Sequence, residues 1–205
     1  MVETPSRRYA SRIRVLVDDW CRIADTPAAA PAFGELVESA AGGHRLAAAR
    51  LCTDGTPIEV CERLGSQPSG PSITCEGVSP DAMTGTIGAA VGHARPAGAI
   101  FFEKMPTRAN ATIWIGAESD ARGRVHGKIY LSLDGRVARD AARRCTRALA
   151  VVAPGSMSHV ARAAHFLEAR GYLRMLALSF GRDAFIGAKL YARFRNIDLA
   201  DLGAL

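Results

Sequence analysis

The sequence has little cysteine, and the cysteines it has are not arranged as a zinc site or a disulfide framework. Five stand at positions 21, 52, 61, 75 and 145, an odd number without a C-x-x-C pair. Zinc sites and disulfide scaffolds both need closely spaced or evenly paired cysteines. The pattern therefore favours reduced thiols in a reducing cytosol, and we expect neither a metal nor another cofactor.

The chain also lacks a long apolar run. No stretch approaches the roughly 20 apolar residues that a membrane helix needs. Residues 1–20, MVETPSRRYASRIRVLVDDW, have no uninterrupted apolar core of the kind found in signal peptides. These absences predict a soluble, cytoplasmic protein without a membrane partner.

Motifs for nucleotide or metal chemistry are missing as well. The sequence contains no Gly-rich phosphate loop, no H-E-x-x-H and no zinc-type spacing. A net charge of +6 and a pI of about 9.4 favour acidic partners, and phosphorylated small molecules fit that sign. The basic run in RDAARRC, residues 139–145, is typical of a solvated helix face, so we expect no nucleic-acid partner.

What remains is a chain of 205 residues with 48% hydrophobic residues, which is enough for one packed domain. Its periodicity predicts an α+β protein. We expect N-terminal helices in residues 1–43, an αββα region in 44–195 and a tail in 196–205. Helices are expected at 7–24, 33–41, 79–94, 136–150 and 157–170. About eight strands are expected, at 44–52, 56–65, 71–77, 97–105, 110–119, 124–133, 172–180 and 185–195.

Two of the predicted strands carry the same polar pair, Lys-x-Tyr. In HGKIYLSL the polar phase contains His126, Lys128 and Tyr130, and in GAKLYARFR it contains Lys189, Tyr191, Arg193 and Arg195. Alternate residues of a strand point to opposite faces, so each strand has an apolar face and a polar one. Each strand also follows an apolar strand and a Gly/Asp/Arg turn. We interpret this repeated pattern as a duplicated αββα unit.

Residues of the other strands fall on the same polar phase. Glu59 alternates with Ile58 and Val60, Glu76 follows Cys75, and Trp114 lies between two isoleucines. Most half-polar strands simply face solvent, and that explanation stays open. Aromatic residues among the charges favour a cavity for a partly apolar, anionic ligand instead. Cys61 and His126 also share this phase, which leaves a Cys–His nucleophilic pair as a remote alternative.

These residues resemble the aromatic prenyltransferases of the ABBA, or PT-barrel, fold, in particular the indole (dimethylallyltryptophan synthase-like) branch. Lys128-Ile129-Tyr130 and Lys189-Leu190-Tyr191 match the family's Lys-x-Tyr strand pairs. Thr56-Pro57-Ile58-Glu59 matches a T/S-P-x-E strand, and SITCE, ending in Glu76, matches the strand after it. The match touches residues 44 to 195.

The resemblance implies an antiparallel barrel, or strongly curved sheet, of αββα repeats surrounded by helices. The lysines, with Arg193, would bind an allylic diphosphate, and Tyr130 and Tyr191 would shield the allyl cation. Glu59 would accept a proton from the acceptor, with Trp114, Glu76 and His126 as further substrate-binding residues. The expected activity is metal-independent transfer of an allylic group to an aromatic or peptide acceptor in natural product biosynthesis.

The sequence departs from the family in two places. A family arginine that binds diphosphate falls at Ser72, and the chain stops where the family adds another αββα unit, so it resembles a shortened member. Two alternatives therefore stand beside prenyl transfer. One is a cyclase, lyase or isomerase that uses the same barrel without a diphosphate. The other is a non-catalytic subunit whose barrel is completed by a second copy or a partner enzyme.

Overall fold

The computed structural model describes residues 5–43, 58–61, 70–76, 113–120, 122, 124–133, 138–167, 171–181 and 184–194. Its helices are α1 (Pro5–Ile23), α2 (Ala30–Gly43), α5 (Ala138–Val152) and α6 (Met157–Leu167), with short 3₁₀ turns at Pro27–Ala29 and Pro154–Ser156. Its strands are β1 (Ile58–Cys61), β2 (Ser72–Glu76), β3 (Ile113–Ser119), β4 (Val125–Ser132), β5 (Gly171–Phe180) and β6 (Phe185–Phe194).

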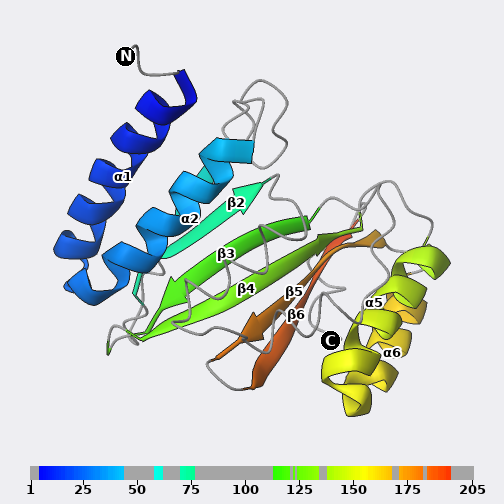
Figure 1. The fold of residues 1–205 in the computed structure, drawn as a ribbon. Helices are drawn as coiled ribbons and strands as arrows, with labels where there is room; N and C mark the ends of the chain where they lie inside the picture. The colour runs from blue at the N-terminus through cyan, green and yellow to red at the C-terminus, as the bar shows by residue number, and fades with distance from the viewer. Residues whose placement is uncertain are drawn as a thin grey trace.

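The six strands form one antiparallel sheet in which each strand pairs with the next along the chain. The helix pair α5–α6 connects β4 to its neighbour β5. Figure 1 shows this pair at one end of the sheet and α1 and α2 at the other. The architecture is therefore α+β, as the sequence predicts.

The described strands form an open sheet, and the expected barrel of about eight strands is not shown. Among the described strands, β1 and β6 are the two edges and do not pair with each other. The expected strands at 44–52 and 97–105, the expected helix at 79–94 and the tail at 196–205 lie outside the described residues.

One face of the sheet packs against the helices. Its central side chains, Ile129, Leu131 and Leu133, are fully buried, as their alternation predicts. The helices α2, α5 and α6 all contribute to this core, and α1 packs on α2. Because alternate strand residues point to opposite faces, the polar residues between these positions project away from the helices.

The first helix departs from its expected packing. An amphipathic helix packs its apolar stripe, which here includes Leu16, Val17 and Ile23, against the rest of the protein. Val17 is indeed buried, but Leu16 is 62% exposed and Ile23 is 85% exposed. The helix packs on α2 along a narrow strip rather than on the sheet, so one side of its apolar stripe stays in solvent. No helix that the structure describes combines the length and apolar character needed to span a membrane.

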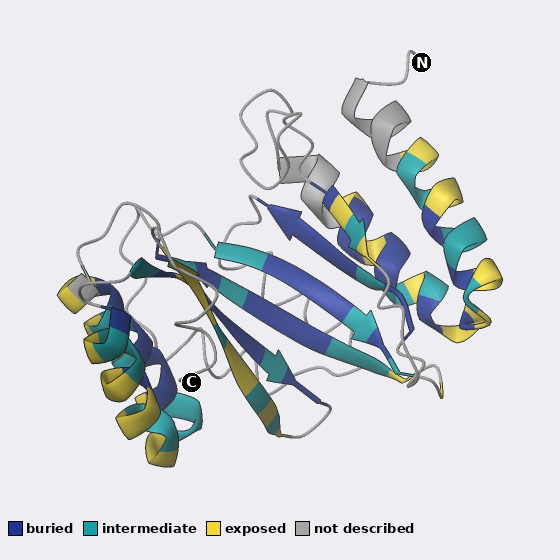
Figure 2. Ribbon diagram, turned by 180° about the vertical axis from the view of Figure 1, so that it is seen from behind, coloured by how far each residue is buried: buried dark blue, intermediate teal, exposed yellow. Residues whose placement is uncertain are grey.

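Both faces of the central strands are shielded from solvent. Figure 2 shows β2, β3 and β4 largely in the colour of buried residues, whereas β6 is mostly exposed. Thr74, Glu76 and Lys128 are each at most 9% exposed although they point away from the helices. A fully solvated polar face is therefore wrong for the centre of this sheet.

Candidate functional site

The register of the sheet brings the predicted site residues to one face, which we call the polar face. Directly opposed residues of antiparallel strands project to the same side of a sheet. The pairs along β1 to β6 therefore place together Glu59, Glu76, Trp114, His126, Lys128, Tyr130, Lys189, Tyr191 and Arg193. Arg195 lies outside the described residues.

Six of these side chains stand in two neighbouring rows that run across the strands. The first row is Glu59, Thr74, Gly116, Lys128, Ser179 and Gly187. The second row is Glu76, Trp114, Tyr130, Ala177 and Lys189. Neighbouring strands lie about 4.8 Å apart, so Glu59 and Lys128 are separated by about 14 Å within their row.

The polar face is divided by charge. Its carboxylates all belong to the first three strands, where Glu118 joins Glu59 and Glu76. Its lysines and arginine all belong to β4 and β6. Aromatic side chains lie at the boundary, with Trp114 on β3 opposite Tyr130 on β4. A surface of this kind presents proton acceptors on one side and anion-binding groups on the other.

Lys128 is held by an ion pair that sequence reasoning missed. Its Nζ contacts Oε2 of Glu118, the diagonal neighbour on β3, and the Lys128 side chain is only 11% exposed. The alternation of Trp114, Gly116 and Glu118 could have assigned Glu118 to this face. Its pairing with Lys128 depends on the register between two strands, which no local pattern reveals.

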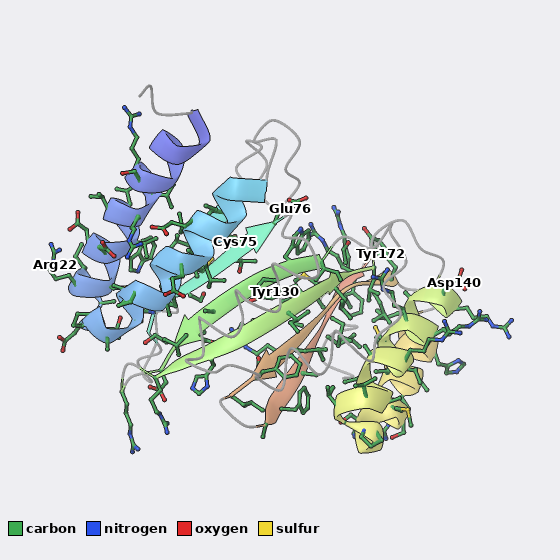
Figure 3. All side chains as sticks on the ribbon, viewed as in Figure 1. Arg22, Cys75, Glu76, Tyr130, Asp140 and Tyr172 are labelled. Atoms are coloured by element: carbon green, nitrogen blue, oxygen red, sulfur yellow. The ribbon has the colours of Figure 1, made fainter. Side chains whose placement is uncertain are left out.

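Tyr130 crosses its neighbouring strand to reach Thr74. Gly116 lies between them, and a Cβ on it would lie 3.3 Å from the Tyr130 ring and 3.2 Å from Thr74 Oγ1. The absent side chain leaves room for the ring. Burial raises the pKa of Tyr130 to about 12 despite its hydrogen bond with Thr74. Tyr130 is therefore a neutral phenol at physiological pH, near the middle of the sheet (Figure 3).

Tyr130 interacts electrostatically with residues of several strands. Besides burial, the charges of Tyr191, Glu118 and Cys61 contribute to raising the pKa of this phenol. Cys61 belongs to β1 and Tyr191 to β6, which are the two edges of the described sheet and five strand spacings, about 24 Å, apart if the sheet were flat. Tyr130 reaches across β3 to Thr74 on β2, so its hydroxyl lies between these two edges and within electrostatic range of both.

The edge residues of the polar face are open to solvent. Glu59 on β1 and Lys189 and Arg193 on β6 are exposed, and Tyr191 is 40% exposed. These groups contrast with the buried Lys128 in the centre. A ligand from solution would therefore reach the β6 cations directly, because their side chains lie at the surface.

Two nitrogen atoms on the polar face lack hydrogen-bond partners among the residues that the structure describes, Trp114 Nε1 and His126 Nδ1. His126 Nε2 lies 3.6 Å from Asp120 Oδ2 in the turn between β3 and β4. Burial disfavours the Asp120 carboxylate, but hydrogen bonds from Arg124 and Arg122 outweigh it and lower the pKa of Asp120 to about 2. The turn thus holds a fixed negative charge beside His126.

The structure does not bring Cys61 and His126 together as a nucleophilic pair. They share a row, but two strands lie between them and the strand spacings sum to about 14 Å. Within the described ranges, no three histidine, cysteine or acidic side chains come together in a way that could hold a metal ion.

A groove of about 450 Å³ lies on the opposite, helix-covered side of the sheet, between α6 and the strands β5 and β6. Sequence reasoning missed it, because it depends on how α6 packs at the edge of the sheet. Its lining is apolar apart from one arginine, and the residues are Arg162, Ala163, Phe166, Leu167, Leu173, Leu190, Ala192 and Phe194.

Comparisons of the chain with protein-family models, with curated proteins and with solved structures found no match in any of the three. The argument for function therefore depends on the geometry of the polar face.

Proposed function

We propose that the chain is a prenyltransferase-like enzyme that transfers an allylic group from a diphosphate to an aromatic or peptide acceptor on its polar face. The observation that carries this proposal is the division of that face by charge. Cations on β4 and β6 suit the donor, and carboxylates on β1 to β3 suit an acceptor that loses a proton. Closure of this sheet into a barrel belongs to the same proposal.

The diphosphate would bind at the β6 side. Lys189 and Arg193 are exposed cations four residues apart on the same face of one strand. Charge-assisted hydrogen bonds from such groups to a diphosphate favour cleavage of the allylic C–O bond, because the leaving oxygen keeps the electron pair. Lys128 would strengthen the site once a ligand competes with Glu118 for its ammonium group.

The tyrosines would stabilise the cation that this cleavage leaves behind. Tyr130 on β4 lies at the boundary with the acidic half and Tyr191 lies between Lys189 and Arg193 on β6, and Tyr130 stays neutral because burial raises its pKa to about 12. A neutral phenol ring attracts a cation through its π-face without forming a covalent bond to it.

The acceptor would bind on the acidic half. Trp114 provides an aromatic surface and an indole N–H without a partner among the described residues. The acceptor carbon forms a bond to the allylic cation and then loses a proton, which Glu59 accepts. Glu59 faces Thr74, the hydrogen-bond partner of Tyr130, so base and cation shield belong to one connected group.

The test begins with binding of the donor. We expect dimethylallyl and geranyl diphosphates to raise the melting temperature and to bind measurably in calorimetry, with inorganic diphosphate as a probe of the anion site alone. Lys189→Ala or Arg193→Ala should weaken binding about tenfold, since each removes a charge-assisted hydrogen bond. Arg143→Ala, on the exposed face of α5, is the matched control and should bind like the native chain.

Turnover provides the second test. With an acceptor found by screening indoles and aromatic peptides, Glu59→Gln should lower kcat by 10² to 10⁴, roughly the range for loss of a general base, and leave donor binding unchanged. No binding of either allylic diphosphate at millimolar concentration would reject prenyl transfer.

A lyase or isomerase without a diphosphate is the second candidate. The ion pair between Lys128 and Glu118 favours it, because that lysine is already neutralised. Ser72 stands where the resemblance expects an arginine, and its hydroxyl donates a hydrogen bond to the carbonyl oxygen of Cys61. In that case carbonyl or carboxylate compounds, rather than allylic diphosphates, should stabilise the chain, and Glu59→Gln should still abolish turnover.

A further inference from the structure

The outer edge of β6 is unusual for a strand at the edge of a sheet. It is ten residues long, and none of the other strands that the structure describes pairs with its outer side. Edge strands usually carry proline, a bulge or a very short length that prevents pairing with another chain. β6 contains no proline. Of the two register shifts between β5 and β6, the one at Ser179/Phe180 leaves Ile186 as an extra residue near the start of β6, whereas residues 187–194 of β6 contain no extra residue.

The same strand exposes apolar side chains. Ile186 is 56% exposed and Phe194 is 36% exposed, and Phe194 projects to the helix-covered side. Phe194 also lines the apolar groove beside α6 and packs edge-to-face on Phe166, with ring centroids 6.2 Å apart. The strand therefore offers a backbone edge on which none of the described strands lies and, beside it, apolar surface that a further strand would cover.

We propose that β6 pairs antiparallel with β6 of a second copy of this chain, with Leu190 on the two-fold axis. A symmetric pair makes each residue contact its counterpart in a self-complementary pattern. Directly opposed residues must project to the same side of the sheet. The possible registers therefore differ by shifts of two residues, and each shift moves the two-fold axis by one residue. Each register predicts a different set of charge contacts.

Only one of the three central registers avoids like charges in direct opposition. With Leu190 on the axis, Lys189 faces Tyr191 of the second copy and Arg193 faces Gly187. With Lys189 on the axis, two lysines face each other. With Tyr191 on the axis, Lys189 faces Arg193 twice. Like charges directly opposite destabilise an antiparallel pair, whereas cation–aromatic contacts stabilise it.

The apolar side of the strand fits the same register. Leu190 meets Leu190, Ala188 meets Ala192, and Ile186 meets Phe194, so the exposed Ile186 of each copy lies beside the groove of the other. Space on the polar side fits as well. A Cβ at Gly187 would meet no atom within 4 Å, which leaves room for the Arg193 side chain of the second copy.

This association goes beyond the proposed function and does not depend on it. It would join two polar faces into one continuous surface, with the exposed cations of both copies near the axis. The second copy is the occupant that the charge pattern of β6 favours. A segment of the same chain on this edge would leave the protein monomeric, which is a distinct outcome of the test.

Sedimentation or light scattering over micromolar to millimolar concentrations tests the proposal. We expect the native chain to be a dimer at the upper end of that range. Ile186→Asp should make it monomeric, because a carboxylate would be placed against the apolar groove twice per dimer. Ile23→Asp, at an equally apolar but 85% exposed position on α1, is the matched control and should leave the dimer intact. A native chain that is monomeric throughout would overturn the proposal.

Two variants that place opposite charges at position 191 test the register, and they remain informative if Ile186→Asp fails to fold. Tyr191→Lys places lysine opposite Lys189 twice and should weaken dimerisation about tenfold. Tyr191→Glu removes the same ring but places opposite charges together, so it should dimerise at least as tightly as the native chain. Equal weakening by both variants would overturn the proposed register.

Single cysteines provide an independent test of the axis. Leu190→Cys should form a disulfide between copies under oxidation, identified by peptide mapping, because only the axial residue faces its own counterpart. Lys189→Cys and Tyr191→Cys should link poorly. A dominant link through either of these two would contradict the proposed register.

Discussion

The two Lys-x-Tyr pairs have the same local sequence pattern and opposite surroundings. On β4, Lys128 is buried and paired with Glu118. The ring of Tyr130 lies over Gly116, and its hydroxyl forms a hydrogen bond with the side chain of Thr74. On β6, Lys189 is exposed and Tyr191 is 40% exposed. The same three-residue pattern is thus built into the sheet in one place and open to solvent in the other.

The position of each strand explains this difference. β4 has a neighbour on both sides and can satisfy its polar groups across β3, whereas β6 lies at an edge and has a described neighbour on one side only. Buried polar groups are costly unless they are paired, so the central pair needs partners that the edge pair does not. The edge pair is therefore the better candidate for a ligand or a second chain.

The lysines should show the largest difference in stability. Lys128→Ala would leave the mostly buried carboxylate of Glu118 without its cation and should lower the free energy of unfolding by about 2–3 kcal/mol. Lys189→Ala, at the exposed edge, should change it by less than about 0.5 kcal/mol. Urea denaturation of both variants measures the contrast.

The double variant Lys128→Ala/Glu118→Ala is the control for this first prediction. Removal of both charges should restore about 1 kcal/mol relative to Lys128→Ala alone, because no unpaired carboxylate remains. Equal stability of the two single lysine variants would break the comparison between β4 and β6.

The two glycines of the first row should behave differently as well. A Cβ at Gly116 would lie 2.5 Å from the carbonyl oxygen of Ile73, whereas a Cβ at Gly187 would meet nothing within 4 Å. Gly116→Ala should therefore destabilise the protein by about 2 kcal/mol through overpacking. Gly187→Ala should be neutral or slightly stabilising. Thermal unfolding of the pair would show whether the centre of the polar face is as tightly packed as the geometry indicates.

The tyrosine hydroxyls should give the smallest effect. Tyr130→Phe removes the partner of the buried Thr74 hydroxyl and should cost about 1 kcal/mol. Tyr191→Phe, at the exposed position, should cost less than about 0.5 kcal/mol. Chemical denaturation at neutral pH measures both, and a larger loss from Tyr191→Phe would contradict the expected order.

The raised pKa of Tyr130 adds a pH signature to this last comparison. The phenol ionises near pH 10 when unfolded and near pH 12 when folded, so the unfolded state loses its proton first. The resulting stabilisation is complete below pH 10 and is lost as the pH rises toward 12. Ultraviolet titration should show a phenolate step near pH 12 that Tyr130→Phe removes and Tyr191→Phe retains.

Local sequence patterns predicted much of the fold, because alternation and turn residues act over a few positions. The strand alternation of Ile129 and Leu131 identified the face that packs on the helices, and the helical period identified α5 and α6. Leu16 and Ile23 stay exposed although they belong to the apolar stripe of α1, since the period shows that a helix is amphipathic but not how wide a strip its neighbour covers.

The candidate site likewise contains residues that the sequence predicted and partners that it did not. The polar phase of each strand was readable from its own residues, including Glu59, Trp114 and Lys189. The partners Glu118 and Thr74 could not be assigned, because each depends on which residue of a neighbouring strand stands opposite. The groove beside α6 depends on the docking of a helix against an edge strand, and it left no local signal.

The sequence by itself thus determined which side chains share a face, because the side-chain period of a strand is set by backbone geometry. Tertiary structure alone decided which Lys-x-Tyr pair is buried and which is open. That difference arises because burial and pairing depend on the neighbours of a strand, and a central strand and an edge strand of identical pattern have different neighbours.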